Sequence, residues 1–375
     1  HNHQPVGNFD HVFEQAVERS YAPFVDLLAE HPRVRLGLHF TGCLLEWLEG
    51  HKPGLLSTIR ELVERGQVEI LGGGWAEPML AVLPDRDATG QIRMMRAECA
   101  RLFGAVPRGM WLAERVWDPD LPRVLRSAGA EYTLLDDTHF RYAGLLDERL
   151  TGHYVTEKAG EAVSVFPIDR ELRYAIPFSE PEEAVAAIRS AGPGRTVTYG
   201  DDGEKFGVWP ETHEWVWGKG WLRRLFELLE QDEAGVELLL PSEQLDRHRS
   251  SGRVYLPTAS YHEMGEWTLG PEAGRRLLDL KHDLVDQGLA ERAEPFLHGG
   301  IWMGFLAKYP EANVLHKRML RASAKVAQAA REDDGGPAAA SSARRALYRG
   351  QCNCPYWHGL YGGLYLPHLR HAVYR

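Results

Sequence analysis

Short apolar runs alternate with amphipathic segments along the first two thirds of the chain. Apolar residues recur at a helical period, which predicts amphipathic helices over 54–67, 87–104, 121–129, 182–192 and 220–231. Runs rich in β-branched and aromatic residues predict strands over 34–40, 68–73, 109–114, 131–137, 195–202 and 254–260. Strand–helix alternation repeated this often indicates parallel strands joined by helical crossovers.

A closed barrel and an open doubly wound sheet both fit this alternation. The positions of polar and acidic residues favour the barrel, because such residues follow one strand after another: His1 and His3, Glu77, Glu114, Asp136 and Asp137, Asp201 and Asp202, and Glu263. A barrel gathers the carboxyl ends of all its strands around one mouth. An open sheet would spread the same side chains along a crevice.

The pattern becomes purely helical after residue 270. Helices are predicted over 271–288, 310–330 and 365–375, and the stretch 331–345 is predicted to be a linker or surface loop. We therefore predict a barrel domain over 1–268 and a helical domain over 269–375 that packs over the active-site cleft.

Composition and charge narrow the function classes. The 375 residues carry a formal net charge of -10, which argues against a nucleic-acid partner because phosphate binding needs clustered Lys and Arg. No apolar run is long enough for a membrane span, so no membrane partner is expected. Four cysteines are too few for a disulfide scaffold, which favours a reducing, cytoplasmic location. The Cys-Asn-Cys pair at 352–354 lacks the CxxC spacing of zinc sites, so no metal and no cofactor are predicted.

Two stretches place carboxylates where chemistry is expected. In "GMWLAERVWDP", Glu114 ends an apolar strand between two tryptophans, and strand alternation argues against simple pairing with its neighbour Arg115. In "TYGDDGEKFGVWP", two aspartates end a strand, although Asp-Gly is also a turn signal. One of them should point into the barrel mouth, and periodicity leaves open whether it is Asp201 or Asp202.

Paired carboxylates on separate strands suit glycoside hydrolysis. One carboxylate must attack or stabilise the anomeric carbon while the other holds a proton for the leaving oxygen. The 11 tryptophans of the chain can supply flat faces for sugar rings, and neutral His, Asn and Gln side chains can bond sugar hydroxyls.

The ordered motifs "HNHQP", "GGGWAEP", "WLAERVW", "DDGEKFGVWP" and "CNCPYWHGLYGGLYLPHLR" resemble the characteristic segments of glycoside hydrolase family 57. "YLPTASYHEMGEW" and "GGIWMGFLAKYPEANVLHKRML" resemble its 4-α-glucanotransferase and α-amylase branch. The resemblance implies an incomplete (β/α)7 barrel followed by a helical domain. It also implies retaining chemistry on α-1,4-glucans such as starch, glycogen and maltooligosaccharides. The first barrel strand is then expected upstream of His1, and a β-rich domain beyond Arg375.

The resemblance also assigns roles to residues. It implies that Glu114 is the nucleophile and Asp202 the acid/base. Sugar-binding roles are implied for His1, His3, Glu77, Trp111, Trp209, Trp357 and His358. Because Trp111 and Glu114 are three residues apart, both can face one cleft only if the strand bends or bulges at its end.

The sequence differs from the family motifs at two places that bear on substrate binding. The family branch has Asp-Ala where this chain has Cys354-Pro355, which removes a carboxylate expected on the acceptor side and leaves hydrolysis or transfer open. Trp75 and Ala76 stand where another aromatic pair is expected.

Two alternatives to this function and the oligomeric state remain open. One alternative is a metal-dependent carbohydrate hydrolase or deacetylase, with His1, His3 and an aspartate as ligands. The other is a catalytically weak carbohydrate-binding homologue. The sequence leaves open whether the protein forms a homodimer.

Overall fold

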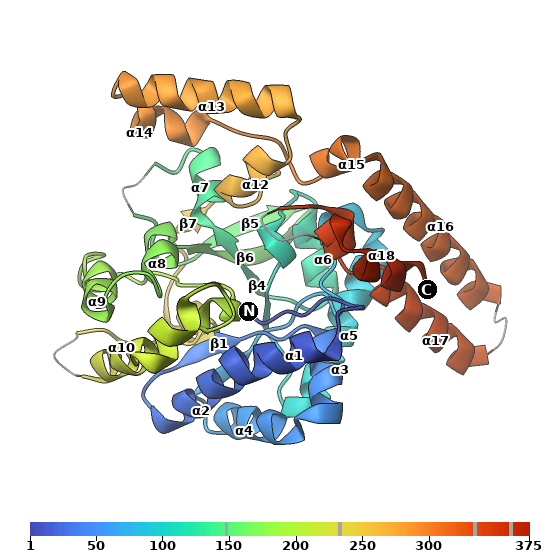
Figure 1. Cartoon of the computed structure of the whole chain (residues 1–375), viewed down its shortest axis with the longest axis horizontal. Helices are drawn as coiled ribbons and strands as arrows, with labels where there is room; N and C mark the ends of the chain where they lie inside the picture. The colour runs from blue at the N-terminus through green and yellow to red at the C-terminus, as the bar shows by residue number, and fades with distance from the viewer. Residues whose placement is uncertain (147–148, 232–234, 333–335, 360–362) are drawn as a thin grey trace.

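Parallel strands form the centre of the molecule in the computed structural model, which describes residues 1–146, 149–231, 235–332, 336–359 and 363–375 (Figure 1). The central strands are β1 (Leu36–Leu38), β2 (Val68–Ile70), β3 (Gly109–Met110), β4 (Tyr132–Asp136) and β6 (Glu161–Ile168). β1 pairs with β2, and β3, β4 and β6 pair in that order, all in parallel. A parallel bridge between Gly72 and Met110 joins the two groups.

Single bridges extend this parallel array at both edges. Asn2 pairs with Phe40 beyond β1, and Thr198 pairs with Ile168 at the end of β6. The described residues thus place seven extended segments side by side in parallel. The Gly203 N–H donates to the His1 carbonyl at 2.6 Å and connects the two edges at one end.

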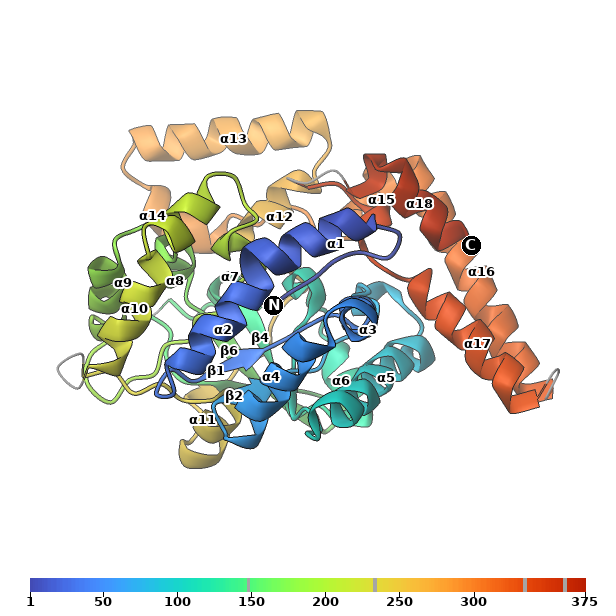
Figure 2. The ribbon, with the colours of Figure 1, turned by 60° about the horizontal axis from the view of Figure 1, so that its bottom comes forward.

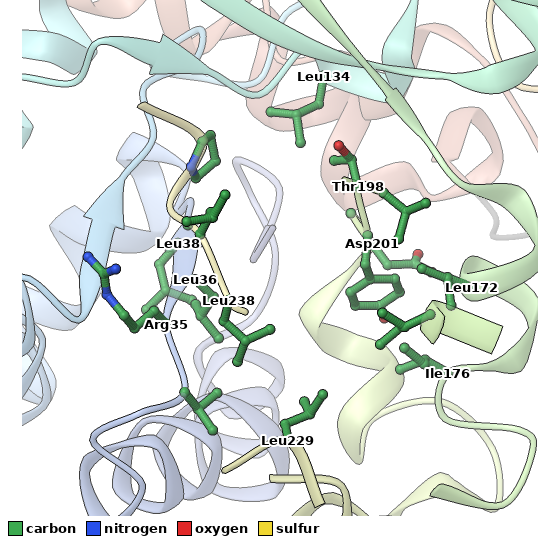
Figure 3. Close-up of a pocket in the computed structure, with 18 of the residues that line it drawn as sticks. Arg35, Leu36, Leu38, Leu134, Leu172, Ile176, Thr198, Asp201, Leu229 and Leu238 are labelled. Carbon is green, nitrogen blue, oxygen red and sulfur yellow. The ribbon is translucent and has the colours of Figure 1, made fainter. Parts of the chain in front are cut away.

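Away from that connection, the two edges stand apart around a cavity of about 810 Å³. Leu36 and Leu38 of β1 line one side of it, and Thr198 and Ile176 line the other (Figure 3). The array is therefore a barrel that is incomplete between β1 and the Thr198 segment.

Two further strands are added beside β6, outside the barrel. β5 (Tyr154–Lys158) forms an antiparallel hairpin with β6, and β7 (Gly252–Arg253) pairs in parallel with β5.

Helices cover the outside of the barrel, and further helices form most of the chain after residue 262. The covering helices are α1 (Asp10–Ala16), α2 (Ala22–Glu30), α3 (Gly42–His51), α4 (Pro53–Glu64), α5 (Asp85–Phe103), α6 (Leu121–Ser127), α7 (Asp137–Tyr142), α8 (Arg170–Ala175), α9 (Pro181–Arg189), α10 (Trp221–Glu230) and α11 (Pro241–Arg247). α4 illustrates why they pack: Leu56, Ile59 and Leu62 lie on one face and are buried. Burial of such a side chain contributes roughly 1.5–3 kcal/mol.

The later helices lie beside the barrel mouth rather than around the barrel. They are α12 (His262–Trp267), α13 (Pro271–Asp286), α14 (Ala290–Ala293), α15 (Gly304–Lys308), α16 (Pro310–Glu332), α17 (Gly336–Arg349) and α18 (Pro367–Tyr374). In both ribbon views α13 and α14 flank one side, while α16 and α17 extend from another (Figures 1 and 2). The segment after α17 returns to the barrel, where the Asn353 N–H donates to the Glu77 carbonyl at 3.2 Å. Among the described helices, none combines the length and hydropathy needed to cross a bilayer.

Several predicted elements differ from the structure. The β5–β6 hairpin and helices α1 to α3 were not predicted, and the predicted strand over 254–260 stays irregular around Pro257. The predicted strand over 195–202 contributes only the bridge at Thr198, because the cavity borders its other side. Most of the predicted loop over 331–345 is helical. Residues 331 and 332 end α16, residues 333–335 lie outside the described residues, and α17 begins at Gly336, where an alanine-rich sequence has high helix propensity.

Candidate active site

Glu114 lies in a left-handed turn directly after β3. Its φ is 49° and that of Arg115 is 51°, so two consecutive non-glycine residues adopt a conformation that costs about 1–3 kcal/mol each. The turn ends the strand at Met110, four residues earlier than predicted. The bend predicted at the end of this strand is therefore present, as a left-handed turn rather than a bulge.

The carboxylate of Glu114 is held by a residue from the far end of the barrel domain. The Tyr261 hydroxyl donates to Glu114 Oε2 at 2.8 Å, and the guanidinium of Arg115 lies over the Tyr261 ring at 4.5 Å. Burial raises the pKa of Glu114, and the negative charge of Asp202 raises it further; Arg115 and the Tyr261 hydroxyl oppose this shift. The site thus contains groups that stabilise Glu114 in its ionised form.

Asp201 and Asp202 differ in their partners. The Asp201 carboxylate forms an ion pair with Lys205 and accepts the Asp202 backbone N–H at 2.9 Å. The charge of Asp202 instead raises the pKa values of Glu77, Glu114 and Glu204. The charge of Asp202 therefore acts on the other acids, whereas Lys205 pairs with Asp201.

His1 and Glu77 adjoin these acids. The His1 ring stacks on Trp111 at a centroid distance of 4.8 Å, and its Nε2 lies 3.4 Å from Glu77 Oε1. Its Nδ1 lies 2.7 Å from Nδ1 of His39, so one ring donates to the other. Burial and the charge of Glu114 raise the pKa of Glu77 well above its usual range, which favours a neutral carboxyl group.

His3 lies between Thr41 and the C-terminal segment. Its Nδ1 is 3.3 Å from the Thr41 hydroxyl, and its Nε2 is 3.3 Å from Cys354 Sγ. Burial lowers the pKa of His3 to about 4, so the ring is neutral at neutral pH. Its backbone N–H donates to Glu204, whose pKa burial and the charge of Asp202 raise to about 7.

The predicted aromatic residues occupy different depths. Trp111 is only 3% exposed, and His1 covers one face of its ring. Trp357 is half-buried, and its indole N–H donates to Asn353 Oδ1 at 2.9 Å. Trp209 is also half-buried, with Lys205 Nζ 5.4 Å from its ring centroid. Trp75 is fully buried and therefore offers no exposed face to a sugar.

The remaining predicted polar residues contact other partners. His358 packs edge-on against Tyr365, with ring centroids 4.9 Å apart. Asp136 pairs with Arg173 at 2.5 Å, and Glu263 accepts the Tyr174 hydroxyl at 2.5 Å.

Three residues around the acids were not predicted individually. Tyr261 lies within the "YHEMGEW" motif, His39 lies within the first predicted strand, and Asn353 lies within the "CNC" motif. The motifs around these residues stand out in the sequence. Their hydrogen-bond partners, however, are 147, 38 and 276 positions away in the chain.

The alternative metal constellation of His1, His3 and an aspartate is not among the candidate ligand clusters of the described residues. Two other groups are: His1 with His39 and Glu77, and His3 with Cys352 and Cys354. The first group already contains the hydrogen bond between the two imidazoles.

Comparison with known families matches both parts of the chain. The sequence model of glycosyl hydrolase family 57 matches residues 1–257. The chain belongs to glycosyl hydrolase family 57. The model of the α-amylase/4-α-glucanotransferase middle domain matches residues 300–375 of this family 57 chain.

Curated relatives cover all of the family 57 chain. It is 45% identical over 377 residues to an α-amylase of Pyrococcus furiosus and to a 4-α-glucanotransferase of Thermococcus litoralis. It spans 56% and 55% of those two proteins, so slightly more than half of their length.

Solved structures support the same fold. The crystal structure of the T. litoralis 4-α-glucanotransferase matches with a TM-score of 0.93 over 100% of this chain and 57% of that one, at 45% identity. A family 57 branching enzyme from Pyrococcus horikoshii matches with a TM-score of 0.60 at 16% identity, over 96% of each chain, and shares the fold. The predicted α/β class with an incomplete barrel and a helical C-terminal region is confirmed.

Proposed function

We propose that this chain carries the catalytic site of a retaining enzyme that cleaves α-1,4-glucosidic bonds of α-glucans and passes the glucan either to water or to a second glucan. The observation that carries the proposal is that Glu114 and Asp202, both half-buried, act on one another, since the charge of Asp202 raises the pKa of Glu114. The names of the two 45% identical relatives, an α-amylase and a 4-α-glucanotransferase, support the substrate class.

Glu114 is the proposed nucleophile. It attacks the anomeric carbon while Asp202 protonates the departing glucosidic oxygen, and a covalent glycosyl-enzyme forms. Tyr261 and Arg115 favour the ionised form of Glu114 that the attack requires. Asp202, now ionised, then takes a proton from water or from the 4-hydroxyl of a second glucan, which attacks the same carbon.

The surrounding residues are proposed to bind the sugar. Burial favours the neutral forms of His3 and Glu77, and His1 lies beside Glu77. These side chains can therefore exchange hydrogen bonds with sugar hydroxyls. Trp111 stacks against one face of the His1 ring and holds that ring in place.

Residues further from the acids are proposed to form outer sugar contacts. The half-buried rings of Trp209 and Trp357 are proposed platforms for neighbouring glucose units, with His358 beside them.

The remaining assignments follow the same pattern. Residues 1–268 are proposed as the catalytic domain and 269–375 as the helical domain, which the family matches at 1–257 and 300–375 support. All proposed site residues come from one chain, so a homodimer is not required. Four free thiols favour a cytoplasmic location.

Azide rescue tests the two roles separately. With α-maltosyl fluoride, whose leaving group needs no acid, Glu114→Ala plus azide should give a β-glycosyl azide by direct displacement. Asp202→Ala should still form the glycosyl-enzyme and give the α-glycosyl azide. On maltooligosaccharides we expect Asp202→Ala to lower kcat by about 10²–10⁴-fold.

Glu266→Ala is the matched control, because Glu266 bonds Lys281 outside the site and should retain activity. Near-normal turnover by Glu114→Ala would refute the nucleophile, and an absence of α-azide from Asp202→Ala would refute the acid/base. Products longer than the maltooligosaccharide donor would establish transfer, and only shorter ones would establish hydrolysis.

A further inference from the structure

Two cysteines and a histidine meet at the edge of the proposed active site. His3 Nε2, Cys352 Sγ and Cys354 Sγ all lie within 4.8 Å of one another. The sequence argued against a metal here because the Cys-Asn-Cys spacing differs from CxxC. The third group, His3, lies 351 residues away from Cys354 in the chain and is therefore absent from the local motif.

We propose that His3, Cys352 and Cys354 form a binding site for a thiophilic cation of the Zn²⁺ class. Thiolate and imidazole are the ligands that Zn²⁺ and other soft or borderline cations select. Three protein ligands leave a fourth, open position for water or another small ligand.

The ligand spacing suits such an ion. Zn–S bonds of about 2.3 Å and Zn–N bonds of about 2.0 Å place neighbouring ligand atoms of a tetrahedral site about 3.5–3.8 Å apart. His3 Nε2 and Cys354 Sγ are already 3.3 Å apart, and no pair exceeds 4.8 Å. Side-chain movements of about 1 Å therefore complete the geometry.

The groups behind the ligands orient them. Thr41, which is fully buried, lies 3.3 Å from Nδ1 of His3, so the other ring nitrogen is directed at the thiols. The backbone N–H groups of Val6 and Cys354 donate to Cys352 Sγ, which is itself fully buried. Such outer partners fix ligand orientation in metal sites. Cys43 is turned away, because its thiol donates to the Gln4 carbonyl at 3.1 Å.

Ion binding also affects catalysis if the proposed function is right. A bound ion occupies His3 Nε2, which the proposed function assigns to substrate. Zn²⁺ is therefore expected to inhibit in competition with maltooligosaccharide.

Cadmium titration of the metal-free full chain tests the site directly. Two thiolates bound to Cd²⁺ give an ultraviolet ligand-to-metal charge-transfer band, and we expect it to saturate at one Cd²⁺ per chain, with release by excess Zn²⁺. Cys354→Ser and His3→Gln should each weaken binding at least about tenfold. Cys354 and His3 are half-buried, so these variants should fold, which circular dichroism checks.

Cys99→Ala is the matched control, since it removes a buried thiol in α5 outside the cluster and should bind Cd²⁺ like the wild type. Absence of the charge-transfer band in the wild type, or unchanged affinity in Cys354→Ser, would overturn the proposal. Glu114→Gln separates this site from the proposed function, because it should lose turnover but keep full Cd²⁺ binding. Binding without inhibition would leave the metal site standing and contradict the sugar contact of His3.

Discussion

Tyr261→Phe isolates the hydrogen bond that holds the proposed nucleophile. The substitution removes only the hydroxyl that donates to Glu114 Oε2 at 2.8 Å and keeps the ring beneath Arg115. A hydrogen bond to a charged group contributes about 1.5–3 kcal/mol. Since 1.36 kcal/mol corresponds to one pH unit or a tenfold change, kcat/KM should fall by about 10–150-fold.

The pH profile tests whether the loss acts through Glu114. Glu114 must be ionised to attack, so activity is lost as pH falls through its pKa. Loss of the hydrogen bond raises that pKa further, and the acid limb of kcat/KM should move up by about one to two pH units. Tyr142→Phe is the control, because it removes a hydroxyl that donates to the Leu297 carbonyl at 3.2 Å. An unmoved acid limb with less than about threefold loss would refute this reasoning.

Two stability predictions follow from buried charges. Asp136→Asn breaks the buried ion pair with Arg173, and urea unfolding should show a free energy of unfolding lower by about 3–5 kcal/mol. Asp120→Asn breaks an exposed ion pair and serves as the control, which should cost less than about 1 kcal/mol. The pKa of Glu204 is about 7 in the folded protein, against an ordinary value of 4.5. Between these pH values the folded protein binds a proton that the unfolded chain has lost, so the free energy of unfolding falls as the pH rises. Glu204→Gln should remove this slope, which amounts to about 3 kcal/mol, and an unchanged slope in urea melts at pH 4.5 and 7 would contradict it.

Much of the fold followed from the helical periodicity of apolar residues, although α4 buries its apolar face and α13 has no buried residue. The helix predicted over 54–67 is observed at Pro53–Glu64, and that over 271–288 at Pro271–Asp286. The errors occur where tertiary contacts override local pattern. The strand predicted to reach Glu114 ends at Met110, because the left-handed turn is held by contacts from distant segments, such as the Ser260 hydroxyl on the Glu114 carbonyl.

The proposed catalytic aspartate shows what sequence reasoning from local pattern alone could not decide. The chain has two Asp-Asp pairs at predicted strand ends, at 136–137 and 201–202, and they are equivalent in local pattern. In the structure Asp136 pairs with Arg173, Asp137 with Arg141 and Asp201 with Lys205. Within the described residues, Asp202 has no such ion pair.

A cation partner favours the ionised form of a carboxylate, which makes it a poorer proton donor than the same group without one. A carboxylate without a cation partner is not constrained in this way. The cation of one pair comes from 37 residues further along the chain, so no local window of sequence contains it. The choice between the acids therefore depends on which of them the fold leaves without a cation, and on this basis we propose Asp202 as the acid that exchanges a proton with substrate.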